Sequence, residues 1–529
     1  MLSKPIREKY LTSFLPDALV IACCMMSIGL SIIESRLNTD AHHWGLMYAN
    51  AADLNKGLIP YKEIFIQYGF LTTLIQSFSL KILGNTVVSV GIITGIFYAA
   101  NIYLSYCLWQ KILNRWLSSL SAALMFLIHP YISYPWSNYF SYTFLLASLL
   151  ILTKLPERGS RYFIAGVFLA FSFLARQTAL LCVPIPICLY FLIRYFGSEK
   201  VFQGLQRRNI GMFLLGMLSV VIIFALFLFR NSAIRDWINQ TFKIVAFYVP
   251  TFGLVLKTIL GFAYYRLITA RTYGGRDVRS LLYTFAFFNN LVIGVIVFLK
   301  FPRNKVSERG LLFFLFGSVA LFGYLQSSNI YEVFRLQNSS SLGIGLLVFS
   351  FYEASNLFKR WKRLAFNIPI ICLIAYLTIT VLFTKTSSVY NPWNKNLLFS
   401  NQLGAPKDID MLKGKLYDIN MRIYYQNLSQ ALGNYKGQLR YLVNLTMDSY
   451  IPLLSVYYKR VQRAPFYGWG LSQGIFQDEQ EKITRLLTEE QAILITENPE
   501  QIPKNYRVAL NLKAPHFEGM TYVAVPTKR

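Results

Sequence analysis

Ionisable side chains gather in a polar stretch at residues 34–69, directly after the first apolar run of the sequence. This stretch holds Asp40, Glu63 and the adjacent pair His42 and His43. Because a charge near lipid is costly, carboxylates beside an apolar run usually serve a function. Asp40 could accept a proton from a hydroxyl group as a catalytic base, or it could cap the helix that follows it. The sequence alone leaves both roles open.

The other polar residues of this stretch have two interpretations each. Glu63 could be a second catalytic carboxylate or a surface charge paired with Lys62. His42 and His43 could join Asp40 around a metal ion, but neighbouring side chains on a helix diverge by about 100°. We therefore expect the histidines to line a pocket without a metal, with a divalent cation as the open alternative. Three more residues could line that pocket or simply lie at a membrane interface: Tyr61, Gln67 and Tyr68.

Two arginines elsewhere in the chain interrupt apolar sequence where they could meet a phosphate. Arg176 stands between two apolar runs, and Arg335 precedes another. A guanidinium group forms bidentate, charged hydrogen bonds with phosphate oxygens. An arginine that snorkels toward water, or a salt bridge from Arg335 to Glu332, would explain the two positions equally well.

The composition is that of a membrane protein. The chain of 529 residues is 54% hydrophobic and 15% charged, and its mean hydropathy of +0.40 is too high for an ordinary soluble enzyme. Its net charge of +27 comes mostly from short basic clusters between apolar runs, so we expect no nucleic-acid partner. The six cysteines lie within apolar runs and predict no disulfide framework.

Eleven apolar runs approach the roughly 20 residues that a membrane-spanning helix needs. We expect an α-helical polytopic membrane protein with about eleven transmembrane helices. The runs are 14–34, 87–109, 117–130, 139–153, 162–175, 178–195, 210–229, 282–300, 311–325, 339–356 and 365–384.

Basic residues set the predicted orientation. The segments assigned to the inner side hold 20 Lys and Arg residues against four acidic ones. Because basic loops stay in the cytoplasm, the N-terminus is predicted to be cytoplasmic. Eleven crossings then bring the C-terminal part to the outer face, which would be the periplasm if the membrane is a bacterial inner membrane.

The chain divides by composition into two predicted domains. Residues 1–384 form the transmembrane domain, with a catalytic outer loop at 34–86, in which 68–83 is an interfacial helix, and a long outer loop at 230–281. That long loop is unusually basic, and a further crossing within 252–270 is an alternative. Residues 385–529 hold 12 of the 25 acidic residues and read as a small soluble α/β domain.

The stretch Ala52–Glu63, ADLNKGLIPYKE, resembles the first outer loop of the GT-C superfamily of integral-membrane glycosyltransferases. The relevant branch contains the protein O-mannosyltransferases and the lipid A aminoarabinose transferases. The order of first span, acidic loop, interfacial helix, later spans and soluble tail extends the resemblance over most of the chain.

The resemblance implies an enzyme that moves a sugar, with inversion, from a polyprenyl-phosphate donor to a hydroxyl group at the outer membrane face. The acceptor would be a lipid-linked glycan, a lipopolysaccharide or a protein. Asp40 matches the early aspartate of the family, Glu63 the acid after the Pro-Tyr pair, and Arg176 a basic residue near the lipid phosphate. One departure is that Ala41 follows Asp40 where the family commonly has Asp-Glu.

Two other functions fit the same composition. A transporter or flippase of lipid-linked sugars would show inverted repeats and charged helices at mid-membrane. The sequence shows no repeat, and its polar residues gather at one predicted face, which favours an enzyme. A polymerase or ligase of surface polysaccharide would share the substrates but not the early loop motif.

Overall fold

The structure of the chain is a computed structural model that describes most of its residues. The described segments are 4–66, 69–129, 134–153, 158–196, 207–243, 271–272, 275–276, 278–300, 307–327, 333–358, 368–369, 371–373, 375–376, 403–435, 441–454, 462–463, 477–489, 491–515 and 519–527. Outside them lie Gln67 and Tyr68, the alternative crossing at 252–270, and most of the predicted last span at 365–384.

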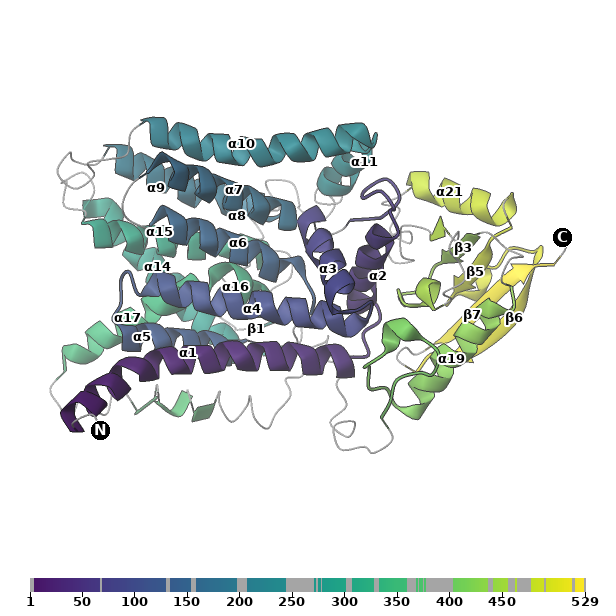
Figure 1. Cartoon of the computed structure of the whole chain (residues 1–529), viewed down its shortest axis with the longest axis horizontal. Coiled ribbons are helices and arrows are strands. Elements are labelled where there is room, and N and C mark those ends of the chain that lie inside the picture. Colours follow the sequence, from purple (N-terminus) through teal and green to yellow (C-terminus); the bar gives the residue numbers. More distant parts are fainter. Residues whose placement is uncertain are drawn as a thin grey trace.

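Long helices run side by side and form one elongated bundle (Figure 1). They coincide with apolar runs of the sequence, as expected from residues that must bury or face lipid on every side. They are α1 (Lys4–Leu37), α4 (Val87–Trp109), α5 (Arg115–Ile128), α6 (Ser137–Leu152), α7 (Gly159–Ala175), α10 (Arg207–Arg230), α14 (Val278–Lys300), α15 (Glu308–Gly323) and α17 (Leu342–Asn356).

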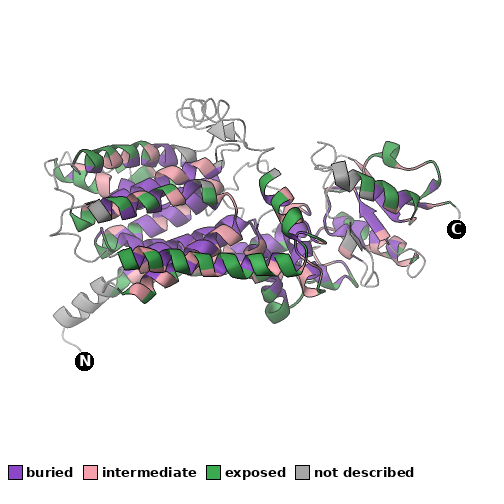
Figure 2. Ribbon diagram, turned by 90° about the horizontal axis from the view of Figure 1, so that it is seen from above, coloured by how far each residue is buried: buried purple, intermediate pink, exposed green. Residues whose placement is uncertain are grey.

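The outside of the bundle is apolar. In the described part of the chain, five helices are long and apolar enough to cross a membrane, namely α1, α4, α10, α14 and α15. Side chains such as Leu214, Ile223 and Phe229 on α10 are 56%, 69% and 73% exposed. Figure 2 shows exposed residues along the outer helices around a buried interior. A surface of this kind is stable in lipid and not in water, so the predicted α-helical polytopic membrane fold is confirmed.

Two predicted spans are interrupted. The run 178–195 divides into α8 (Ala179–Cys182) and α9 (Pro184–Phe196), because Pro184 has no N–H and starts a new helix. The run 339–356 begins inside α16 (Val333–Ser340) and continues as α17, with Ser341 between them.

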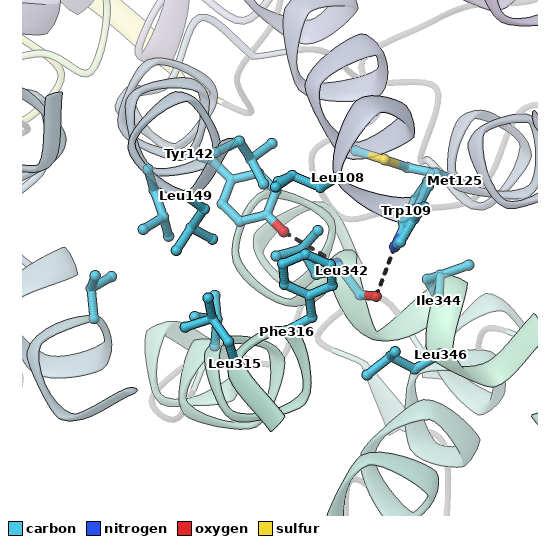
Figure 3. Close-up of a cluster of buried hydrophobic side chains, with 14 of the residues drawn as sticks. Leu108, Trp109, Met125, Tyr142, Leu149, Leu315, Phe316, Leu342, Ile344 and Leu346 are labelled. Carbon is cyan, nitrogen blue, oxygen red and sulfur yellow. Dashed lines mark hydrogen bonds between the residues drawn. The ribbon is translucent and has the colours of Figure 1, made fainter. Parts of the chain in front are cut away.

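Hydrogen bonds stabilise the second interruption inside the bundle core (Figure 3). The Tyr142 hydroxyl accepts from the Leu342 N–H at 3.2 Å, and the Trp109 indole N–H donates to the Leu342 carbonyl at 3.0 Å. Backbone groups freed by a broken helix must find partners away from water. Tyr142 is such a partner for the Leu342 N–H, and Trp109 adds a bond to the carbonyl of the same residue within an otherwise apolar cluster.

Two short helices lie across the end of the bundle, between it and the C-terminal domain (Figure 1). They are α2 (His43–Asn55) and α3 (Phe70–Leu83), and α3 confirms the helix expected over 68–83. Helix α3 buries Thr72, Gln76 and Ser77 and exposes Phe78 and Ile82, at 62% and 63%. Polar residues inward and apolar residues outward suit a helix that meets lipid.

The remaining helices connect these elements. On one side of the bundle, α10 continues into α11 (Ile234–Ile238) and the single-turn helix η1 (Asn239–Lys243). Two-residue strands β1 (Arg271–Thr272) and β2 (Gly275–Arg276) pair antiparallel before α14, and η4 (Tyr324–Ser327) follows α15.

The C-terminal part folds as the small mixed α/β domain that the sequence predicts. Its described strands follow the order β4-β3-β5-β7-β6, with β3 parallel to β4 and β5, and β7 antiparallel to β5 and β6. The elements are α19 (Ile419–Gly433), β3 (Tyr441–Asn444), β4 (Gln462–Arg463), α21 (Gln477–Thr488), β5 (Ile493–Thr496), β6 (Tyr506–Lys513), β7 (Met520–Pro526) and the short turns η6 (Asp410–Leu412), η7 (Ile451–Leu453) and η8 (Pro499–Gln501). Because residues 377–400 lie outside the described segments, the boundary at 385 stays a prediction.

Candidate active site

Asp40 lies in the short connection between α1 and α2, and its carboxylate does two things. Oδ1 accepts the backbone N–H groups of His42 and His43, both at 2.9 Å, which caps the start of α2. Oδ2 lies 2.8 Å from Nδ1 of the His43 ring. The side chains of Asp40 and His43 are 16% and 11% exposed, so the pair is shielded without being sealed. Helix capping and pairing with a histidine therefore occur in the same carboxylate.

The neighbouring histidines act on the Asp40 carboxyl against the effect of burial. Burial by itself raises the pKa of the Asp40 carboxyl, but the charge and hydrogen bond of His43, helped by His42, hold this pKa well below its usual range. Burial, and after it the neighbouring charge of His43, lowers the pKa of His42 to about 4, while Asp40 acts in the opposite direction. Asp40 is therefore ionised and His42 neutral at neutral pH.

A group of aromatic rings continues the site from His43. The His43 ring lies 4.8 Å from the Tyr134 ring and 5.1 Å from the Trp136 ring, measured between centroids. Tyr134 and Trp136 stack at 5.5 Å. The guanidinium carbon of Arg335 lies 5.3 Å from the centroid of Trp136, which is a cation–π distance. The Trp136 ring thus contacts both Arg335 and the His43 ring.

Arg176 reaches the same segment from the end of α7. It is 6% exposed, and its guanidinium donates to the Ser137 hydroxyl and the Thr178 hydroxyl, both at 2.8 Å. Ser137 is the first residue of α6, directly after Trp136. The start of α6, where a helix carries partial positive charge, therefore contacts Arg176 through Ser137 and Arg335 through Trp136.

Helix α3 holds the ends of α6 and α7 in place. The Gln76 amide donates to the Pro135 carbonyl at 2.9 Å, and the Thr72 hydroxyl donates to the Ala175 carbonyl at 2.9 Å. Gly69, at φ +116°, packs its backbone against that same carbonyl. The segments that carry Trp136 and Arg176 are fixed relative to each other through α3.

Glu63 and Tyr61 belong to a second group, on the far side of the loop after α2. Oε2 of Glu63 accepts the Ile59 N–H at 2.7 Å and closes a turn. Tyr61 is buried at φ +68° with its ring against Phe224 at 6.3 Å. Through these contacts the loop packs against α10. In the described part of the chain, Glu63 and Tyr61 are linked to Asp40 along α2 and make no direct side-chain contact with it.

The sequence analysis missed the residues that link the predicted ones. Tyr134, Trp136 and Ser137 lie in a stretch in which the sequence analysis names no candidate residue. Their sequence signal is an aromatic run at the start of an apolar helix, YPWSNYF, which is too common to predict a site.

Comparisons with known proteins bear on the fold. Scans against protein-family models and against curated proteins give no match. Among solved structures, the chain is similar to ArnT from Cupriavidus metallidurans bound to undecaprenyl phosphate, with a TM-score of 0.50 and 10% sequence identity. The similarity covers 96% of this chain and 97% of that one. At this identity the match concerns the fold alone, and the chain has the ArnT-like polytopic membrane fold.

Proposed function

We propose that this protein is an integral-membrane glycosyltransferase that takes a sugar from a polyprenyl-phosphate carrier and transfers it to a hydroxyl group. The observation that carries the proposal is that Trp136 and Ser137, neighbours at the start of α6, contact Arg335 and Arg176, while the Trp136 ring also lies against His43 of the Asp40–His43 pair. Positive charge and a proton acceptor are the two things that such a transfer needs in one place. The ArnT-like fold supports the same reaction class by analogy.

The reaction would be a single displacement. The oxygen of the acceptor hydroxyl attacks the anomeric carbon, the bond from that carbon to the phosphate oxygen breaks, and polyprenyl phosphate leaves. The proton of the hydroxyl passes to the Asp40–His43 pair. Because Asp40 accepts three hydrogen bonds and has a depressed pKa, we assign the proton to the pair and not to Asp40 alone.

The phosphate that gains charge as the bond breaks would be stabilised by the two arginines. Arg176 is nearly buried, where a guanidinium interacts more strongly with an anion than it does in water. The N-terminus of α6 adds its dipole. Undecaprenyl phosphate in the similar ArnT structure supports a polyprenyl carrier here, and the apolar outer surface of the bundle suits a lipid tail.

The remaining assignments belong to the same proposal. We retain Glu63 as a second acid and Tyr61, Gln67 and Tyr68 as lining residues of the donor or acceptor pocket. The acceptor class is a lipid-linked glycan, a lipopolysaccharide or a protein. Basic inner loops support a cytoplasmic N-terminus and an outer-face site in a bacterial inner membrane.

A transfer assay with the Asp40→Asn variant tests the proposal. The full chain in lipid nanodiscs is incubated with a panel of undecaprenyl-phosphate-linked sugars and with glycolipid, lipopolysaccharide and protein acceptors. We expect transfer from one donor, reduced by about 10² to 10⁴-fold in Asp40→Asn. The matched control is Asp418→Asn, because Asp418 also caps a helix, accepting the Met421 N–H at 2.9 Å, but lies in the C-terminal domain.

Three results would count against the proposal. No transfer from any donor, with donor flipping across the bilayer instead, would favour a transporter. An equal loss of transfer activity in Asp40→Asn and Asp418→Asn would indicate that Asp40 serves only as a helix cap. Full transfer activity in Asp40→Asn would show that the Asp40–His43 pair takes no part in the reaction.

A further inference from the structure

The C-terminal domain docks directly on the end of α1. The Leu416 N–H donates to the Arg36 carbonyl at 2.8 Å, and the Arg36 guanidinium donates to the Gly414 carbonyl at 3.0 Å. Residues 414–416 therefore pair with the last turn of a membrane helix almost 380 positions away in sequence. This contact lies within a few residues of Asp40.

Lys415 lies at the centre of this contact and is fully buried. Its ammonium group donates to the Ser35 carbonyl at 3.0 Å and to the Asn38 carbonyl. Carbonyls at the C-terminus of a helix lack partners within the helix and carry partial negative charge. A lysine from the C-terminal domain thus caps α1 at the point where the chain turns toward Asp40.

Asn38 connects Lys415 to Asp40. Its carbonyl accepts from Lys415, its amide donates to Glu34 Oε1 at 2.8 Å, and its Oδ1 accepts the Asp40 N–H at 2.7 Å. Lys415 of the C-terminal domain therefore holds Asn38 in place, and Asn38 in turn holds the backbone of Asp40.

A second contact of the C-terminal domain holds the other side of the Asp40 loop. The Ser449 N–H donates to the Ala41 carbonyl at 3.3 Å. A Cβ added at Gly45 of α2 would lie 2.8 Å from the Ser449 Cβ. The packing of α2 against Ser449 therefore leaves no room for a side chain at position 45. The Asp40 loop is clamped between residues 415 and 449.

We propose that Lys415 is a positioning residue of the candidate active site, through which the C-terminal domain clamps the loop that carries Asp40 and His43. The inference rests on the proposed function only where it concerns catalysis, because the clamp itself can be measured without substrate. A buried ammonium group is costly, and its contribution here is the placement of the Asp40–His43 pair.

Charge supports the same assignment. Burial lowers the pKa of Lys415 to about 7, while Glu34 of α1 and Asp40 of the loop act in the opposite direction. The ring of Tyr417 lies 5.0 Å from the ammonium nitrogen on the side of the C-terminal domain. His42 and His43 beside Asp40, and Tyr450 from the C-terminal domain, are further titratable groups that interact with the Asp40 charge. Lys415 and Asp40 should therefore titrate as coupled groups.

Hydrogen–deuterium exchange of the full chain in nanodiscs tests the clamp. In Lys415→Met, the amides of residues 38–45 should exchange at least tenfold faster than in the wild type, and Lys415→Arg should restore part of the protection. Lys413→Met is the matched control, because Lys413 is exposed two positions away, and it should exchange like the wild type. Gly45→Ala, which pushes against Ser449, should loosen the same residues if Lys415→Met fails to fold.

Two further readouts separate positioning from simple structural support. The NMR titration of the Lys415 side chain should have a midpoint near 7. The midpoint should move lower in Asp40→Asn and not in Asp418→Asn, because Asp40, together with Glu34, acts on the charge of Lys415. If the transfer reaction is found, Lys415→Met should lower kcat about tenfold with KM for the donor unchanged within twofold.

Each outcome has a distinct meaning. Wild-type exchange at residues 38–45 in Lys415→Met, or a titration midpoint near the ordinary lysine value of about 10.4, would overturn the clamp. Loss of transfer by all variants alike, the control included, would overturn the link to catalysis. Absence of transfer in the wild type would refute the proposed function and leave the exchange result to decide the clamp.

Discussion

His42 should make the protein sensitive to mild acid. Its imidazole has a pKa of about 4 in the folded chain, against 6.5 for an ordinary histidine, because burial disfavours its charged form. The unfolded chain therefore binds a proton more readily than the folded one. Stability is complete above pH 6.5 and is lost progressively as the pH falls from 6.5 to 4.

The magnitude follows from the size of the shift. A difference of about 2.5 pKa units at about 1.36 kcal/mol each corresponds to roughly 3 kcal/mol of unfolding free energy. Asp40 acts in another window, since a depressed carboxyl pKa contributes stability that is lost only below its unfolded value of about 3.9. The interval between pH 6.5 and 4 therefore reports on His42.

The assay compares the wild type with His42→Gln, which keeps a polar side chain that does not titrate. Unfolding free energies are measured by denaturant titration in detergent at pH 7.5, 5.5 and 4.0. The wild type should lose roughly 3 kcal/mol more than His42→Gln between the first and last values. Equal losses in the two proteins would refute a neutral, buried His42, and a larger loss in the variant would reverse the sign of the argument.

Two further predictions concern the phosphate side of the site, with binding of undecaprenyl phosphate to nanodisc-embedded protein as the measurement. Gly69→Ala should weaken binding about tenfold and cost on the order of 3 kcal/mol of stability, because φ is +116° and the new Cβ would lie 2.3 Å from the Ala175 carbonyl beside Arg176. Its control, Gly57→Ala, has φ +89° but open space around the new Cβ, so it should cost about 1 kcal/mol and leave binding unchanged; equal effects would contradict the argument. Trp136→Leu removes the ring under Arg335 and should raise the Kd about fivefold, for a cation–π energy of about 1 kcal/mol. Trp116→Leu, at a half-exposed tryptophan on α5, should leave the Kd unchanged, and a Kd that does not respond to Trp136→Leu would remove Arg335 from the phosphate site.

Much of the fold could be predicted because its determinants are local. An apolar run of spanning length dictates a helix wherever it occurs, as in α4 and α10. The gain in acidic residues toward the C-terminus predicted a small α/β domain, which the described strands form. The break at Pro184 has a local cause, the missing N–H of proline. The break at Ser341 could not be predicted, because the Leu342 N–H that it frees has its partner in the distant residue Tyr142.

The sequence by itself determined the membrane class, the helical bundle and the identity of Asp40 as the residue to examine, because composition and charge patterning act over short distances along the chain. Tertiary structure alone decided that Asp40 pairs with His43, that Trp136 joins this pair to Arg335, and that Lys415 clamps the loop from a domain far away in sequence. No pattern in the chain encodes these contacts locally. They arise because the ends of α1, α6 and α7 meet at one end of the bundle, and the C-terminal domain packs against it.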